Sequence, residues 1–203
     1  MKKIVLIISF LLLINIVEAR YLVTYESCVD GDTIWVNKEG ESIKVRLISI
    51  NAPEIEHENN VAEEYANEAK EFVCNTLNSA NKVELEYDNN SKKEDKYGRT
   101  LAWIWVDDKL LQKLIIKEGL AKVDYVYKEY EYSKELCMIE KRAVKENKGI
   151  WTIKKEEGYC KDIDVEEMKL DEEDFIITDT LIYIVIGLFF VLCLLIFILV
   201  KKN

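Results

Sequence analysis

Two long apolar runs, one near each end, constrain this chain of 203 residues more than any other feature. The first covers residues 4–17 and the second covers residues 181–200. Both are too uniformly apolar for an amphipathic helix or a half-buried strand, which alternate apolar with polar positions. They leave a water-facing middle of about residues 20–179, which is room for one domain and a polar tail.

The N-terminal run has the layout of a secretory signal peptide. The charged residues Lys2 and Lys3 precede it, and residues 17–19 form a small-residue pattern before Arg20, as at a cleavage site. We therefore expect a signal peptide over residues 1–19. The alternative is an uncleaved anchor, and either version exports the middle of the chain.

The C-terminal run predicts a transmembrane helix. Residues 181–200 carry no charge, and at 1.5 Å per residue they span a hydrocarbon core of about 30 Å. Lys201 and Lys202 follow directly, so residues 201–203 are expected to be a cytoplasmic tail. The expected localisation is a single-pass protein of the cell membrane with its domain extracellular.

An acidic segment separates the domain from this helix. Residues 156–179 hold eleven Asp or Glu against two Lys, and are predicted to be an extended juxtamembrane linker. Residues 20–155, by contrast, hold 22 Lys or Arg and 26 Asp or Glu. A domain without a basic field of its own must hold any polyanion by a local patch.

Four cysteines lie in the exported part of the chain. They are Cys28, Cys74, Cys137 and Cys160, while Cys193 falls within the apolar C-terminal run. An even set in an oxidising compartment suits two disulfides, for which three pairings are open. Free thiols are the alternative. The spacings exclude a zinc site, because no two cysteines have the separation of metal ligands.

The middle of the chain alternates β-rich runs with helical periodicity. Asp30-Gly31 is a turn signal between two of these runs, and Asn59 or Asn60 is the expected N-cap of the first helix. The order predicts an α+β fold, a five-stranded Greek-key OB-fold β-barrel with three packed helices, over residues 20–155. The predicted strands are 21–28, 33–36, 42–50, 83–87 and 100–106, and the predicted helices are 61–77, 110–118 and 133–147.

Three polar clusters stand at fixed places in this pattern: residues 30–33 (DGDT), 45–54 (VRLISINAPE) and 95–99 (DKYGR). Together with residues 119–128 and 149–151, they resemble the staphylococcal nuclease family in order and spacing over roughly residues 21–152. The resemblance implies an endonuclease that uses Ca²⁺ to hydrolyse phosphodiester bonds of DNA, RNA or both.

The residues themselves suit that reaction. Hydrolysis of a phosphodiester needs guanidinium groups that hold charge on the phosphate oxygens and a carboxylate that orients or deprotonates water. Arg46 and Arg99 are the candidate guanidiniums, since their planar forks match two phosphate oxygens. Arg46 stands within an apolar strand pattern, where a charge needs a partner. By resemblance, Glu54 takes the general-base position, and the predicted catalytic set is Arg46, Glu54 and Arg99.

The resemblance also implies a calcium site formed by Asp32, Asn51 and the backbone carbonyl of Ala52. Asp32 follows a turn that can direct its carboxylate towards a hard cation. The family has Asp where this chain has Asn51. An Asn oxygen still binds Ca²⁺, but the site loses one negative charge, which weakens cation binding.

Four further residues correspond to the family's substrate contacts. Lys96 and Tyr97 match the residues beside the neighbouring phosphate, and Tyr125 and Tyr127 match the aromatic pair that lines the base and phosphate subsite. A tyrosine ring stacks on any base. The alternative for the tyrosines is ordinary packing, since the chain contains eleven.

The expected function is therefore that of a membrane-anchored, outward-facing, calcium-dependent endonuclease. A non-catalytic nucleic-acid-binding module on the same fold is the first alternative, because OB-type barrels also bind without cleaving. A displayed adhesion or scaffold domain is the second, although it leaves the two arginines and Glu54 unexplained. The expected partners are a nucleic acid and a membrane, and the sequence points to no protein partner.

Overall fold

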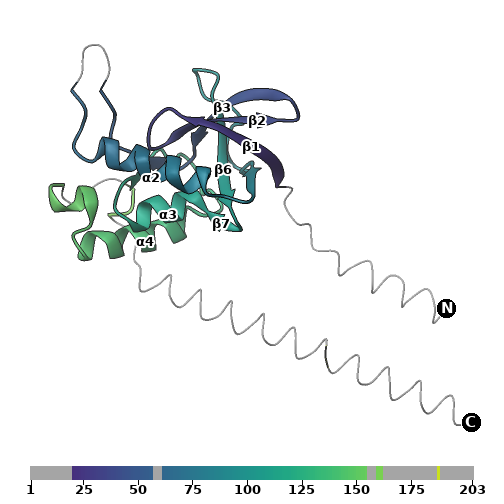
Figure 1. The fold of residues 1–203 in the computed structure, drawn as a ribbon. Helices are drawn as coiled ribbons and strands as arrows, with labels where there is room; N and C mark the ends of the chain where they lie inside the picture. Colours follow the sequence, from purple (N-terminus) through teal and green to yellow (C-terminus); the bar gives the residue numbers. More distant parts are fainter. Residues whose placement is uncertain (1–19, 57–60, 155–158, 162–186, 188–203) are drawn as a thin grey trace, which may run out of the picture. The chain divides into compact units, whose positions relative to one another are not determined.

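The structure is a computed structural model that describes residues 20–56, 61–154, 159–161 and 187 (Figure 1). The predicted signal peptide lies outside these residues, as do the tail and nearly all of the predicted acidic linker and transmembrane helix. Within the described segments, no helix has both the length and the apolar character that a membrane crossing requires.

Five strands close into a barrel, as predicted. They are β1 (Tyr21–Cys28), β2 (Thr33–Lys38), β3 (Glu41–Leu47), β5 (Val83–Glu86) and β6 (Thr100–Val106). Antiparallel pairings join them in the order β3-β2-β1-β5-β6. A parallel pairing of β3 with β6, in which Val45 faces Thr100, closes the ring. This closure brings the end of β3 beside the start of β6.

Three strands of two residues complete the sheets: β4 (Ile50–Asn51), β7 (Lys109–Leu110) and β8 (Lys122–Val123). β7 pairs antiparallel with the end of β6, whereas β4 and β8 form a separate ribbon. The predicted strand 42–50 is wrong at its end, because β3 stops at Leu47. Ser49 turns the chain with a φ of 64°, and β4 then leaves the barrel to pair with β8.

The barrel interior follows the two-residue period of the strands. Ile34 and Val36 of β2 are fully buried, as are Val45 and Leu47 of β3. Since successive side chains of a strand point to opposite faces, the residues between them point outwards. That outer face of β2 and β3 carries the residues of the site described below.

Helices α2 (Ala66–Asn78), α3 (Leu111–Lys117) and α4 (Ser133–Lys145) lie together on one side of the barrel (Figure 1). A 3-10 turn, η1 (Gly149–Thr152), follows α4. The predicted start of the first helix at residue 61 is wrong. Its N-cap is Tyr65, with a φ of 69° and no side-chain cap. Asn59 and Asn60 lie outside the described residues.

Two disulfides tie the helices to their surroundings. Cys28 at the end of β1 is bonded to Cys74 in α2, and Cys137 in α4 is bonded to Cys160. The Cα atoms of the two pairs are 5.7 and 5.2 Å apart, within the range that suits a disulfide. Of the three pairings left open by the sequence, the structure has this one, and the free-thiol alternative is wrong.

A close approach of two glycines joins α3 to the turn that follows α4. Gly119 has a φ of 67°, and its carbonyl oxygen accepts a hydrogen bond from the Ile150 amide at 2.8 Å. A Cβ added at Gly119 would lie 2.3 Å from the Lys148 carbonyl oxygen, and one added at Gly149 would lie 2.2 Å from the Gly119 carbonyl oxygen. No side chain fits at either position.

We predict that Gly119→Ala and Gly149→Ala each lower the free energy of unfolding by about 2–4 kcal/mol, since a positive φ and a backbone clash combine. Gly40→Ala is the matched control: Gly40 also has a positive φ, of 94°, but nothing lies within 4 Å of an added Cβ. It should cost about 1 kcal/mol. Urea unfolding of the three variants measures this, and equal losses would contradict the close approach.

Candidate active site

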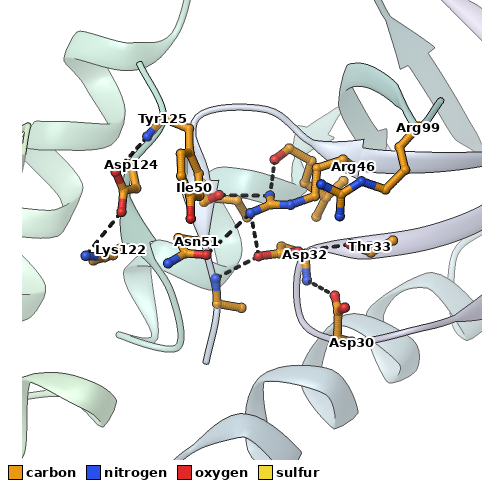
Figure 2. Close-up of polar contacts among 12 residues, drawn as sticks. Asp30, Asp32, Thr33, Arg46, Ile50, Asn51, Arg99, Lys122, Asp124 and Tyr125 are labelled. Atoms are coloured by element: carbon orange, nitrogen blue, oxygen red, sulfur yellow. Dashed lines mark hydrogen bonds and ion pairs between the residues drawn. The ribbon is translucent and has the colours of Figure 1, made fainter. Parts of the chain in front are cut away.

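Arg46 of β3 is a buried charge on the outer face of the barrel, and it has the partner that its place in an apolar strand requires. Its Nη2 lies 2.9 Å from Oδ2 of Asp32, and both side chains are less than one-tenth exposed (Figure 2). Its Nη1 donates to the carbonyl oxygens of Leu47 at 2.8 Å and Ile50 at 2.9 Å. These bonds fix the guanidinium across the turn between β3 and β4.

Asp32 is bonded on all sides. Its carboxylate accepts hydrogen bonds from the Ala52 amide at 2.9 Å and from the Thr33 hydroxyl at 3.0 Å. Burial raises the pKa of Asp32 to about 7, although Arg46 opposes the rise, and the nearby charge of Asp30 adds to it. A further positive charge beside this carboxylate would therefore be favourable.

The turn before Asp32 is packed tightly. A Cβ added at Gly31 would lie 2.7 Å from the Cβ of Ala52 and 2.8 Å from the Cβ of Ala69 in α2. Asp30 accepts a hydrogen bond from the Asp32 amide at 2.9 Å. Only glycine fits between the Ala52 segment and the helix, so the Asp-Gly-Asp sequence sets the position of both carboxylates.

The β4–β8 ribbon brings two more predicted residues to Arg46. Asn51 pairs with Lys122 across the ribbon, and its Oδ1 lies 3.4 Å from Nη2 of Arg46. Beyond β8, the ring centroid of Tyr125 lies 5.6 Å from Cζ of Arg46, and Figure 2 shows the ring alongside the guanidinium. The amide of Asp124, between them, donates to the Ser49 carbonyl oxygen at 3.1 Å.

The predicted cation ligands thus lie together, and their chemistry fits a hard cation. Asp32 supplies a carboxylate, Asn51 a carboxamide oxygen, and the Ala52 peptide is hydrogen-bonded to Asp32; Ca²⁺ prefers oxygen ligands of these kinds. In the described part of the chain, no three His, Cys, Asp or Glu side chains form a metal cluster. The set therefore fits Ca²⁺ in kind, with little charge unless Asp30 contributes.

Arg99 is held by its own loop. Its Nε pairs with Asp95 Oδ2 at 2.6 Å, and Asp95 Oδ1 accepts the amides of Tyr97 and Arg99 at 2.9 and 3.0 Å. Burial raises the pKa of Asp95, but these bonds outweigh it and leave the pKa below its usual value. Tyr97 is 71% exposed, with Lys96 Nζ 4.9 Å and Arg99 Cζ 5.5 Å from its ring centroid.

Arg99 comes from the loop that leads into β6, the strand beside the one that carries Arg46. Arg99 directly precedes Thr100, which pairs with Val45 of β3, and in Figure 2 the Arg99 side chain extends towards that of Arg46. The two guanidiniums leave different donors unbonded. Among the described residues, the Nη groups of Arg99 and the Nε of Arg46 have no hydrogen bond.

Two predicted residues have no contact with this cluster among the described residues. Glu54 is exposed, and within the described segments only its backbone oxygen is bonded, to the Glu63 amide at 2.9 Å. Tyr127 is 79% exposed. Across the described ranges, no hydrogen bond, ion pair or ring contact joins either side chain to the arginines.

Two residues that hold the site escaped prediction. Asp95 orients Arg99, and its signal was present: an Asp before a Tyr-Gly-Arg turn commonly bonds the backbone that follows. Glu140 of α4 is buried and accepts a hydrogen bond from the Val123 amide at 2.5 Å, which fixes β8. No sequence pattern indicated Glu140, because its partner is 17 residues away.

A known protein family matches the part of the chain that carries most of this site. Residues 44–153 match the family model described as "Staphylococcal nuclease homologue". The chain belongs to the staphylococcal nuclease family. The resemblance seen in the sequence is thereby confirmed, and the matched residues include Arg46, Glu54 and Arg99.

Several relatives of this nuclease-family chain cover most of its domain. The thermonuclease of Staphylococcus hyicus is 37% identical over 124 residues, which are 61% of this chain and 72% of the relative. The endonuclease YncB of Bacillus subtilis is 36% identical over 131 residues, 64% of this chain and 61% of the relative. The prophage-derived endonuclease YokF of Bacillus subtilis is 38% identical over 141 residues, 69% of this chain but 46% of the relative.

Proposed function

We propose that this protein is a calcium-dependent endonuclease that hydrolyses phosphodiester bonds in DNA, RNA or both. Family membership and relatives named thermonuclease and endonuclease support a phosphodiester hydrolase. The observation that carries the proposal is the placement of Arg46. This guanidinium is buried, bonded on two sides and next to the strand that begins after Arg99. Because a buried ion pair contributes little net stability, we infer that its role is to bind an anion.

Both arginines bind the phosphate. The Nε–H of Arg46 and the Nη groups of Arg99 donate to the oxygens of the phosphate and stabilise the charge that grows there in the transition state. Glu54 orients the attacking water or removes its proton. Its exposed side chain, without partners in the described segments, is accessible to water and to substrate.

A calcium ion would be held by Asp32, Asn51 and the carbonyl oxygen of Ala52. When bound, it supplies positive charge that polarises the phosphoryl group. The raised pKa of Asp32 and its repulsion by Asp30 support a cation at this place. One carboxylate, one amide and one carbonyl make a weakly charged ligand set, so the affinity for Ca²⁺ is expected to be low.

The aromatic side chains hold the strand on either side of the cleaved bond. Tyr125 lies at Arg46, and Tyr97 lies over Lys96 and Arg99. Lys96 and Tyr97 contact the neighbouring phosphate, and Tyr125 and Tyr127 line the base and phosphate subsite. Stacking on tyrosine is tolerant of sequence, so no strong base preference is expected.

We also propose that the nuclease domain is exported and tethered, on the pattern of the chain's ends alone. A signal peptide over residues 1–19 and a membrane helix over residues 181–200 give one orientation, with residues 20–179 outside. The acidic residues 156–179 are then a solvated spacer that keeps the barrel away from the membrane surface.

For catalysis, Glu54→Gln and Arg99→Lys are each expected to lower cleavage of single-stranded DNA or RNA by at least about two orders of magnitude. Folding should be unchanged, since Glu54 is exposed and Lys retains the charge of Arg99. Glu68→Gln in α2 and Arg142→Lys in α4, both exposed, are the matched controls. Parent-like turnover in either site variant, in the presence of Ca²⁺, would point instead to a non-catalytic binding module.

For the metal, Asn51→Asp is expected to reduce the Ca²⁺ concentration for half-maximal activity by about 3- to 10-fold, because the site gains a carboxylate. Calorimetric titration of Ca²⁺ into the protein without substrate should show the same shift. An unchanged or higher requirement would mean that residue 51 is not a ligand, or that Asp30 already supplies the charge.

For the location, protease added to intact cells is expected to cut within residues 156–179 and release an active nuclease, because solvated linkers are the preferred sites of cleavage. Immunoblotting and a nuclease assay of the supernatant measure this. Release only after the membrane is permeabilised would refute the outward orientation.

A further inference from the structure

We propose that Trp35 and Lys44 form an additional nucleotide-binding subsite next to the catalytic arginines. A base of the substrate stacks on the Trp35 indole, and the phosphate of that nucleotide pairs with the Lys44 ammonium. The proposal rests on the proposed nuclease function, whose site it extends along β3. Its ligand is single-stranded nucleic acid, because a base must be out of a duplex to stack on a side chain.

The register of β2 and β3 puts this pair beside Arg46. Thr33 faces Arg46 across the two strands, and Trp35 faces Lys44 at the second position along. The intervening pair, Ile34 and Val45, is fully buried in the barrel. Trp35 and Lys44 therefore share the outer face with Arg46, about 7 Å further along the strand.

Trp35 differs from Trp103 and Trp105 of β6, which are buried. The indole N–H of Trp103 is bonded to Asp88 at 3.1 Å, and that of Trp105 to Glu86 at 2.6 Å. Trp35 is only partly buried, and its N–H has no hydrogen bond within the described residues. An indole on the outer face, with no structural partner of this kind, is suited to stacking on a ligand.

Lys44 supplies a mobile cation to the same place. Its Nζ lies 4.9 Å from the centroid of the Trp35 ring, and it forms no ion pair with any residue in the described ranges. A base that stacks on the ring displaces this flexible side chain, whose ammonium then lies next to the phosphate of the same nucleotide. Lys44 is also at the level of Arg99, since Thr100 pairs with the next residue of β3, Val45.

The charge pattern sets where the subsite ends. The next outward pair of the two strands is Asn37 and Ser42. Both donate to the carboxylate of Glu26, Asn37 at 3.3 Å and Ser42 at 2.5 Å. A fixed carboxylate repels a phosphate, so the cationic strip runs from Arg46 to Lys44 and stops. The site therefore accommodates one nucleotide beyond the catalytic arginines on this side.

Steady-state cleavage of a single-stranded hexanucleotide by the full-length protein with Ca²⁺ tests the subsite. Trp35→Ala should raise KM by about 5- to 100-fold, the effect of losing one stacked base, with kcat within about twofold. Trp35→Phe should recover most of the loss, because a phenyl ring still stacks. Lys44→Ala should raise KM less, and the increase should shrink at high salt.

The matched control is a second lysine–aromatic pair that also involves β2. Lys38 Nζ lies 4.0 Å from the Tyr21 ring centroid at the far end of β2, away from the arginines. Lys38→Ala should leave both KM and kcat unchanged, whereas an equal rise of KM in Lys38→Ala would mean a general charge effect and would overturn the proposal. Thermal unfolding checks each variant, and if Trp35→Ala does not fold, Lys44→Ala and Trp35→Phe decide.

Failure of the subsite differs from failure of the proposed function. If the parent protein cleaves the hexanucleotide and the Trp35 and Lys44 variants keep its KM, the subsite is wrong and the nuclease stands. If the parent does not cleave, the nuclease is wrong, and fluorescence anisotropy with the labelled hexanucleotide tests the subsite alone. Weaker binding by Trp35→Ala than by Lys38→Ala then supports it, and equal binding refutes it.

Discussion

The buried ion pair of Arg46 and Asp32 is the interaction on which the arrangement of the site depends. Two charges withdrawn from water are tolerated only when every donor and acceptor is well placed. Asp32 comes from the turn after β1, Arg46 from β3, and the carbonyl oxygens that complete the guanidinium from Leu47 and Ile50. The turn after β1, the end of β3 and the start of β4 must therefore lie together for the ion pair to be fully bonded. The turn at Ser49 brings the Ile50 carbonyl oxygen back to Arg46, and β4 leaves the barrel there.

The fold could largely be predicted from the sequence, because the strand period and the turn signals agree with each other. β1 was predicted with its observed bounds, and the core positions of β2 and β3 follow the alternation of apolar residues. The two errors have a tertiary cause. The chain reads as a continuous strand through Ser49, yet the bonds to Arg46 bend it there. Helical periodicity begins at residue 61, yet α2 starts only at Ala66, where its side chains first become buried.

The site was less predictable than the fold. Short clusters along the chain indicated Asp32, Arg46 and Asn51, and Arg46 does contact the other two. Glu140 was missed because it acts on an amide that only the folded chain brings near. Asp95 was missed although it bonds the turn that directly follows it. For Glu54, whose side chain has no partner in the described part of the chain, proximity to the arginines stays a prediction. A residue that the fold holds by several hydrogen bonds can thus be assigned to the site from the structure. A residue that becomes ordered only when the substrate binds cannot be assigned in this way.

The net negative charge of the domain explains why the local placement of a few cations must account for the binding of a nucleic acid. A domain with more acidic than basic residues attracts a polyanion weakly from a distance. Its cations must therefore be concentrated where the nucleic-acid strand passes. The register of the barrel does this, because Arg46 and Lys44 lie two residues apart on one face of β3 and the closure with β6 adds Arg99. Glu26 ends that strip. In the proposed function, a nucleic-acid strand is then held by a few aligned contacts rather than by a broad field, and its position relative to the scissile bond is fixed at the same time.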